Sequence, residues 1–291
     1  MKINIEEVYK TSGTPTYTFV KPKEYTKLIV ALRTKGRGLV VEGPSGIGKT
    51  TSINNAIIES ALNKGKIIQL SARKKQDLEM ISIIPSFDNM GIVIVDDFHV
   101  LHDDIKKSLS DFMKTLADEE SEHSKLILIG INKAGDSLVK FSPDLNNRID
   151  TITFEANPDE KVEELITLGE KALNIEINIK SEIIELSKGS FHIAQMLCKS
   201  TCIISEIIEN QDDLSNTKSS IEIVKETVID ELGRLFFSKA RIFAIGSKLR
   251  KEGRAPYLHL LNWLSTSPEW AINLDEIVNQ YPIMKNSIIK L

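Results

Sequence analysis

The sequence is poor in several features that mark particular classes of protein. It has only two cysteines, Cys198 and Cys202, in 291 residues, too few for a disulfide framework. It has no run of 18 apolar residues, so we expect no membrane span. Its first residues lack the apolar stretch of a secretory signal. Together these absences predict a cytoplasmic protein.

The sequence also lacks internal repeats, low-complexity tracts and an excess of positive charge. The formal net charge is −4, which argues against a general nucleic-acid binder. The charge is unevenly distributed, however, because residues 239–291 carry eight basic and four acidic side chains. Because this segment has a local charge of +4, a DNA contact near the C-terminus stays an alternative.

Cysteine and histidine are too sparse to indicate a metal site of their own. Cys198 and Cys202 lie four residues apart on a predicted helix, with His192 upstream, but two further ligands at a suitable spacing are missing. His99 and His102 fit a polar loop after a strand better than a ligand set. We expect the two cysteines to be small buried core residues.

The most informative segment that the sequence does contain is GPSGIGKT at 43–50, which fits the phosphate-loop pattern G-x-x-x-x-G-K-[ST]. An apolar run over 38–42 predicts a buried strand before it, and helical spacing over 51–62 predicts a helix after it. The alternative is a glycine turn that matches by accident, which would occur in about one chain in a hundred of this length. The strand–loop–helix context favours a nucleotide site.

Each residue type in this loop has a chemical use at its position. Glycines let successive N–H groups point at phosphate oxygens, and the helix start adds a positive dipole end. Lys49 would reach the β- and γ-phosphates, and Thr50 would hold Mg²⁺. The predicted nucleotide-binding residues here are Pro44, Ser45, Gly46, Ile47, Gly48, Lys49, Thr50 and Thr51.

A second apolar run, over 92–95, leads directly into Asp96 and Asp97. A buried strand with two carboxylates at its carboxyl end is the Walker B pattern. Asp96 would join Thr50 at the Mg²⁺ ion, and Asp97 would orient or polarise the attacking water. The alternative is that the two acids only end a strand and begin a loop.

Two more polar residues lie at the ends of predicted strands. Asn132 follows the strand expected over 125–130 and could contact the γ-phosphate or the attacking water, although asparagine is also a common turn residue. Arg148 precedes the strand expected over 149–154 and could act as an arginine finger on a neighbour's nucleotide, or be a plain surface arginine. With Asp97, these are the predicted catalytic residues.

Helical periodicity dominates the second half of the chain. Helices over 158–171, 180–187 and 190–208 would form a small lid, and the polar residues 209–220 predict a linker or exposed loop.

Near the C-terminus, three short helices over 255–264, 272–281 and 282–291 resemble a helix-turn-helix. The basic stretch before them could contact DNA or form a solvated loop. It contains Lys248, Arg250, Lys251 and Arg254.

These motifs together resemble the AAA+ ATPases, most closely the origin-recognition initiator ATPases and the neighbouring STAND signalling ATPases. The resemblance covers roughly residues 17–291. It implies an α/β P-loop NTPase domain with a parallel sheet, a helical lid and a C-terminal winged-helix-like domain. It places an adenine-side segment at 1–22, the ATPase domain at 23–155, the lid at 156–212 and the C-terminal domain at 213–291.

Two details of the resemblance favour the STAND branch. The segment that begins Phe19-Val20 is similar to the "FVGRE" segment that packs near adenine, although Lys21-Pro22 replaces its Gly-Arg pair. Asp97 stands where most AAA+ members have glutamate. STAND proteins commonly have a pair of aspartates here, as this sequence does. The shorter carboxylate implies slow hydrolysis.

The lid segment that ends in His192 resembles the region in which initiator ATPases place a sensor-2 arginine. The resemblance implies a contact of His192 with phosphate, and a neutral imidazole holds phosphate less tightly than a guanidinium does.

The resemblance implies ATP and Mg²⁺ as ligands. It further implies a regulatory switch that hydrolyses ATP slowly and controls self-assembly or a protein effector, as in bacterial signalling or defence. The alternatives are a DNA-binding initiator or transposition-type ATPase, and a nucleotide-binding scaffold with negligible hydrolysis.

Overall fold

A computed structural model describes residues 2–62, 66–131, 134–139, 142–245 and 256–267. The chain divides into two compact units, Met1–Val224 and Lys225–Leu291. The first unit contains all the described strands.

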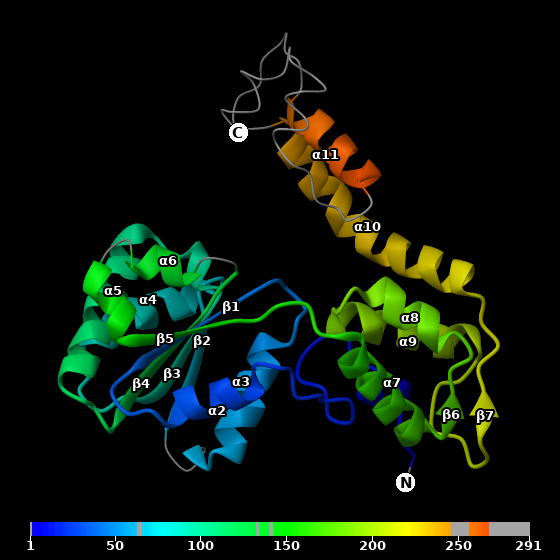
Figure 1. Ribbon diagram of the computed structural model, residues 1–291, viewed down its shortest axis with the longest axis horizontal. Coiled ribbons are helices and arrows are strands. Elements are labelled where there is room, and N and C mark those ends of the chain that lie inside the picture. Colours follow the sequence, from blue (N-terminus) through cyan, green and yellow to red (C-terminus); the bar gives the residue numbers. More distant parts are fainter. Residues whose placement is uncertain (1, 63–65, 132–133, 140–141, 246–255, 268–291) are drawn as a thin grey trace. The chain divides into compact units, whose positions relative to one another are not determined.

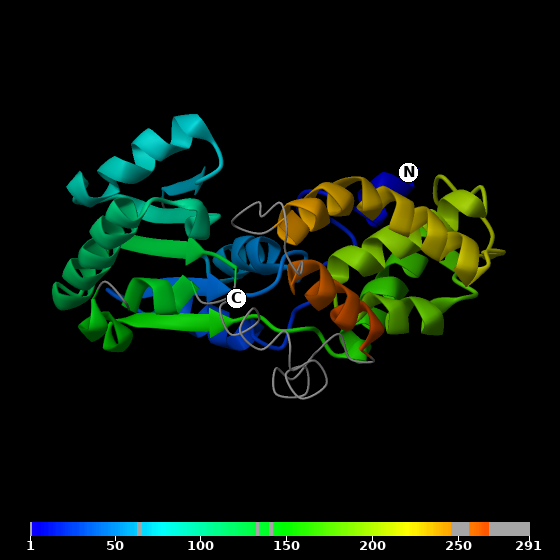
Figure 2. The same ribbon diagram turned by 90° about the horizontal axis from the view of Figure 1, so that it is seen from above.

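The first unit is built on a five-stranded parallel sheet with the strand order β2-β3-β4-β1-β5 (Figures 1 and 2). The strands predicted over 38–42, 92–95, 125–130 and 149–154 are confirmed to within one residue. Because the strands are parallel, their carboxyl ends meet at one edge of the sheet. The strands are β1 (Gly38–Glu42), β2 (Ile67–Ser71), β3 (Gly91–Asp96), β4 (Ser124–Ile129) and β5 (Ile149–Thr153).

Helices cover both faces of this sheet, as Figure 1 shows. Leu39 and Val41 of β1 pack toward α2 (Tyr25–Arg33) and α3 (Lys49–Glu59). Val40, between them, packs with residues of α4, α5 and α6 on the other face. Burial on both faces explains why β1 and β3 appear in the sequence as continuous apolar runs. The second layer comprises α4 (Lys75–Ile83), α5 (Asp103–Asp118) and α6 (Ala134–Val139).

Short 3₁₀ turns connect several of these elements. They are η2 (Ile84–Ser86), η3 (Phe98–Val100) and η4 (Pro143–Asn147).

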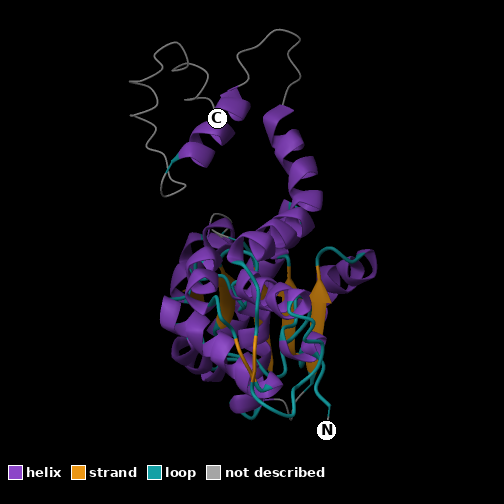
Figure 3. Ribbon diagram, turned by 90° about the vertical axis from the view of Figure 1, so that its right-hand side faces the viewer, coloured by secondary structure: helices purple, strands orange, loops and turns teal. Residues whose placement is uncertain are grey.

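After β5 the chain forms three helices where the sequence predicted those of a lid, and we refer to them as the lid. Its helices are α7 (Asp159–Leu173), α8 (Lys180–Ser187) and α9 (Phe191–Ile204). Gly189, between α8 and α9, has φ +74°, and a Cβ there would lie 2.4 Å from the Asn157 carbonyl oxygen. Glycine is therefore needed where this turn meets the connection from β5. Outside the sheets, helices make up most of the described chain (Figure 3).

The segment 209–220, predicted as a linker or exposed loop, is a mostly exposed loop that hydrogen-bonds to the region around α7 and α8. It contains β7 (Ser215–Asn216), which pairs with β6 (Ile175–Glu176). Thr217 is buried, and its hydroxyl donates to Asn178 Oδ1 at 2.6 Å. Polar composition does not reveal the two buried positions, Thr217 and Ser219, because their hydroxyl groups hydrogen-bond inside the protein.

The N-terminal residues contain a short helix, α1 (Ile5–Val8). It contacts α7 and α9, and Val8 and Tyr9 are fully buried. One turn of helix is too short for apolar periodicity to reveal it.

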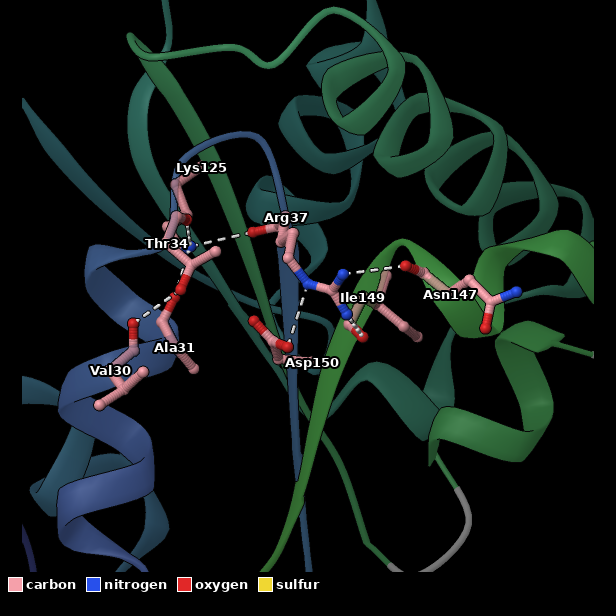
Figure 4. Close-up of polar contacts among 8 residues, drawn as sticks. All are labelled: Val30, Ala31, Thr34, Arg37, Lys125, Asn147, Ile149 and Asp150. Carbon is pink, nitrogen blue, oxygen red and sulfur yellow. Dashed lines mark hydrogen bonds and ion pairs between the residues drawn. The ribbon is translucent and has the colours of Figure 1, made fainter.

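A half-buried lysine, Lys125, ties β4 to the end of α2 at the amino edge of the sheet (Figure 4). Lys125 Nζ donates to the carbonyl oxygens of Ala31, Thr34 and Arg37 at 2.7, 2.6 and 2.9 Å. Arg37 in turn pairs with Asp150 Oδ1 at 3.1 Å. Burial lowers the pKa of Lys125 to about 8, against the opposing effect of Asp150. The cluster satisfies carbonyls that the end of α2 leaves open.

The second unit contains most of α10 (Ile221–Ile245) and α11 (Pro256–Thr266). The helix predicted over 255–264 is confirmed by α11. The helices predicted over 272–281 and 282–291 lie outside the described residues, as do Lys248, Arg250, Lys251 and Arg254. Among the described helices, none combines the length and the apolar character that a membrane span requires.

Candidate functional site

The phosphate loop leaves β1 at the carboxyl edge of the sheet and ends where α3 begins at Lys49. Gly43, Gly46 and Gly48 have φ of +143°, +78° and +99°. A Cβ at Gly43 would lie 2.3 Å from the Phe154 carbonyl oxygen, so any other residue would collide with the end of β5. The loop thus has the backbone conformation in which N–H groups can converge on an anion.

The other side chains of the loop differ in their exposure to solvent. Pro44 and Ser45 are exposed, and Thr51 is half-buried. Ile47 is only 3% exposed and packs into the core with α2 and α3. Ile47 can therefore offer a ligand its backbone but not its side chain.

Lys49 folds back over the loop that precedes it. Its Nζ donates to the carbonyl oxygens of Gly43 and Pro44 at 2.8 and 2.7 Å. Burial lowers the pKa of Lys49, while Asp96 and Asp97 act in the opposite direction. The ammonium group therefore sits at the loop with two neutral acceptors that an anionic ligand could replace.

The sheet brings Thr50 and Asp96 together from elements 46 residues apart. Thr50 Oγ1 donates to Asp96 Oδ2 at 3.0 Å. A hydroxyl and a carboxylate are the oxygen donors that Mg²⁺ prefers. No cluster of three or more histidine, cysteine, aspartate or glutamate side chains suited to a metal occurs in the described parts of the chain. These two groups fit Mg²⁺ if phosphate oxygens and water complete its ligands.

Asp97 is held differently from Asp96. Its backbone is left-handed, with φ +59°, and its N–H donates to Asp96 Oδ1 at 2.8 Å. Its Oδ2 pairs with Arg73 Nε at 2.7 Å and accepts a longer bond, 3.4 Å, from Ser71 Oγ. The second acid is therefore engaged by the end of β2.

Sequence reasoning missed Ser71 and Arg73. The sequence did contain a signal for them. Both follow the largely apolar segment 66–70, and the carboxyl ends of parallel strands lie at the same edge of a sheet. What the sequence does not give is that β2 lies beside β3. Only the strand order brings Arg73 to Asp97.

Glu42, the last residue of β1, was also missed. Its carboxylate accepts from the Gly135 N–H and the Thr153 hydroxyl, both at 3.0 Å. It therefore links β1, β5 and the start of α6 next to the phosphate loop. Asn132, which precedes α6, lies outside the described residues.

The lid reaches the phosphate loop through the first turn of α9. The His192 N–H donates to the Gly46 carbonyl oxygen at 3.1 Å. A Cβ at Gly46 would lie 2.8 Å from His192 Cβ, and one at Gly48 would lie 3.3 Å from the Phe191 ring. The N-terminus of α9 therefore adds its positive dipole end near the loop. The His192 contact seen here is made by its backbone.

Phe19 and Val20 lie on the core that carries the phosphate loop. Val20 is 2% exposed, and Phe19 packs against the same core as Ile47, with its ring 5.8 Å from that of Tyr25. Their location agrees with a segment beside the nucleotide site, and their contact with a base stays a prediction.

Arg148 lies at the amino edge of the sheet, away from the loop of its own chain. Ile149, the next residue, pairs with Gly38 at the start of β1, whereas the loop follows the end of that strand, about 16 Å away at 3.3 Å per residue. Arg148 Nε pairs with Asp118 Oδ1 at 2.6 Å, and a second nitrogen donates to the Asp144 carbonyl oxygen. Arg148 could act only on the nucleotide of another chain.

The two cysteines are free and buried, as the sequence predicted. Burial raises the pKa of the Cys202 thiol to about 12 and that of Cys198 well above its usual value. Both are therefore neutral core thiols at physiological pH.

Neither a protein-family model nor a curated protein matches the sequence. Solved structures do match it. The ORC2 protein of Aeropyrum pernix, solved with ADPNP and ADP, has a TM-score of 0.55 at 13% identity and covers 98% of both chains.

Two other matches are of similar quality. ORC1 of Aeropyrum pernix in complex with DNA has a TM-score of 0.55 at 13% identity, covering 98% of this chain and 87% of that one. A RuvB mutant of Thermotoga maritima has a TM-score of 0.53 at 17% identity, covering 91% and 83%. These matches show that the chain shares the α/β fold of the ORC and RuvB proteins, with a parallel sheet flanked by helices.

Proposed function

We propose that this protein is an ATP-dependent regulatory switch that binds Mg-ATP, hydrolyses it slowly and controls its own assembly or a protein partner. The observation that carries the proposal is the 3.0 Å contact between Thr50 and Asp96 beside a loop with three left-handed glycines. A glycine loop that matched by accident would have no reason to place its last hydroxyl on the carboxylate at the end of β3.

In this mechanism Lys49 leaves the carbonyls of Gly43 and Pro44 and binds the β- and γ-phosphates. Thr50 and Asp96 would hold Mg²⁺, and the ion would supply positive charge to stabilise the phosphates. Asp97, together with Asn132, positions the attacking water. Pro44, Ser45, Gly46, Ile47, Gly48 and Thr51 complete the phosphate side.

Slow turnover follows from the surroundings of Asp97. The ion pair with Arg73 must be broken or moved before the carboxylate can polarise water. This observation also favours the alternative of a nucleotide-binding scaffold with negligible hydrolysis, and the turnover rate distinguishes the two.

The lid supplies the switch. We assign residues 1–22 to the base side, 23–155 to the ATPase domain, 156–212 to the lid and 213–291 to a winged-helix-like domain. The first turn of α9, with His192, touches the phosphate loop, so a bound triphosphate would change how the lid is held.

The experiment is a nucleotide-binding titration with wild type and Lys49→Ala. Removing the ammonium group should weaken Mg-ATP binding by about 100-fold or more, since it removes a charge-assisted contact in a partly buried site. Lys35→Ala, which removes an exposed lysine paired with Glu122, is the matched control and should bind like wild type. Equal affinities of wild type and Lys49→Ala would refute the proposal.

A second candidate function is a DNA-binding initiator or transposition-type ATPase. It is supported by the ORC1 structure, which holds DNA, and by the basic residues Lys248, Arg250, Lys251 and Arg254. Duplex-DNA binding measured at several salt concentrations tests it. Neutralising about four phosphates predicts a slope of roughly −3.6 in log K against log salt. Absence of binding at low salt would leave the protein-partner function alone.

A further inference from the structure

The N-terminal residues form a strap, defined here as residues 3–18, that is bound to the lid. Asn4 forms an antiparallel bridge with Glu209, and the Ile5 N–H donates to the Ile208 carbonyl oxygen at 3.0 Å. The Asn210 N–H returns a bond of 2.9 Å to the Ile3 carbonyl oxygen. The start of the strap is therefore paired with the segment that follows α9.

Tyr9 anchors the middle of the strap in α7. A Cβ at Gly169 would lie 2.4 Å from three atoms of the Tyr9 side chain, so the ring fills the space that this glycine leaves open. The Tyr9 hydroxyl donates to the Ile166 carbonyl oxygen at 3.3 Å, and the side chain is 0% exposed.

The end of the strap is fixed to α9 by a buried pair of polar side chains. Gln195 Nε2 donates to Thr18 Oγ1 at 2.7 Å, and Thr18 Oγ1 donates to the Val8 carbonyl oxygen at 2.9 Å. Thr18 is 1% exposed and Gln195 is 4% exposed. Gln195 lies three residues after His192, whose N–H bonds the phosphate loop. One turn of α9 thus contacts both the loop and the strap.

The next two residues, Phe19 and Val20, follow the end of the strap that is bound to the lid. Phe19 and Val20 pack on the α2–α3 core that also contains Ile47 of the phosphate loop. The chain therefore passes from the lid to the ATPase core between Thr18 and Phe19, at the segment assigned to the adenine side.

We propose that Gln195 is a positioning residue for nucleotide binding: through Thr18 it holds the Phe19–Val20 segment where the adenine base of ATP binds. Strap and lid then move together, and base binding is coupled to the arrangement of the lid. This inference rests on the proposed function, since it requires an adenine nucleotide at the phosphate loop.

The test compares a ligand with a base and a ligand without one. Affinities for Mg-ATP and for magnesium tripolyphosphate are measured by calorimetry for wild type, Gln195→Leu and Thr18→Val, the last a variant of nearly unchanged shape. Each variant should weaken Mg-ATP about five- to tenfold, the worth of one buried hydrogen bond, and leave tripolyphosphate within about twofold. The double variant should be no weaker than Thr18→Val alone, because Thr18→Val already removes the bond that Gln195→Leu removes.

Two controls separate positioning from a general loss of stability. Thr18→Ser keeps the hydroxyl and should retain wild-type affinity for Mg-ATP. Ser200→Ala removes a buried hydroxyl without a hydrogen-bond partner from the same helix and should change neither affinity.

The outcomes also distinguish failure of this inference from failure of the proposed function on which it rests. Equal weakening of both ligands, or unchanged Mg-ATP affinity in both variants, overturns the role of Gln195 while leaving nucleotide binding intact. If wild type binds neither ligand, the proposed function fails, and the inference fails with it.

Discussion

At the scale of single residues, the state of Asp97 decides how the site would work. Asp96 already faces Thr50, but Asp97 is bound to Arg73 and Ser71. The same carboxylate cannot keep this ion pair and act fully on a water molecule. Arg73 is therefore expected to restrain turnover.

Two substitutions should move ATP turnover in opposite directions. Asp97→Asn should keep Mg-ATP affinity and lower the turnover number by about 100-fold, the usual effect of losing a general base. Arg73→Ala should raise the turnover number by about fivefold, since a partly exposed ion pair contributes at most ~1 kcal/mol. Phosphate release under saturating ATP measures both.

Lys74→Ala serves as the control, because it removes a neighbouring positive charge but not the ion pair. Normal phosphate release by Asp97→Asn would contradict the role of Asp97. A lower turnover number in Arg73→Ala would show that the arginine assists the reaction.

Lys125 predicts a pH dependence of stability. Its folded pKa is about 8, below the ordinary lysine pKa of 10.5, so the unfolded chain holds more protons between these values. The free energy of unfolding should therefore rise with pH over this window, relative to Lys125→Met, by about 1–3 kcal/mol. Denaturant unfolding of both proteins from pH 7.5 to 10.5 measures the difference. A constant difference would mean that the lysine pKa is not lowered on folding.

At the scale of elements, the strap and α7 depend on each other through Tyr9 and Gly169. Alanine normally stabilises a helix interior by about 1 kcal/mol relative to glycine. Here the added Cβ would collide with the Tyr9 ring, and overpacking costs about 1–3 kcal/mol. Overpacking should prevail, because the ring is fully buried.

Gly169→Ala is therefore expected to lower the free energy of unfolding in wild type. In a Tyr9→Ala background the same substitution should raise it by about 1 kcal/mol, since only the helix preference remains. Thermal or denaturant unfolding of the four proteins gives both values. The same sign in both backgrounds would mean that the strap does not occupy the space above Gly169.

At the scale of the whole molecule, Arg148 raises the question of assembly. It lies at the edge of the sheet opposite the phosphate loop, so a catalytic role would need a second copy of the chain. Asp118, which now pairs with it, would have to release it when the copies meet.

A mixing experiment tests this arrangement. Lys49→Ala should not bind ATP tightly, and Arg148→Ala should turn over about 10³-fold more slowly if an arginine finger is lost. Their mixture should regain measurable phosphate release, because one variant supplies the arginine and the other the nucleotide site. A mixture of Lys49→Ala with the double variant Lys49→Ala/Arg148→Ala should stay inactive, because the only intact nucleotide site is missing. Wild-type turnover by Arg148→Ala alone would identify Arg148 as a surface residue.

The sequence by itself determined the local chemistry. The glycine spacing, the lysine and threonine after it, and the apolar run before Asp96 and Asp97 each depend only on neighbours in the chain. Apolar patterning likewise predicted strands β1, β3, β4 and β5 and helices α3, α7, α8, α9 and α11, because burial of one or both faces leaves a regular pattern.

Only the tertiary structure decided which of these segments meet. The strand order brings Thr50 to Asp96 and Arg73 to Asp97, and it places Arg148 at the far edge. The strap on the lid and the buried polar pair Thr18–Gln195 were equally hidden. Pairing of strands and satisfaction of buried polar groups depend on residues distant in the chain, and no local pattern records the partner.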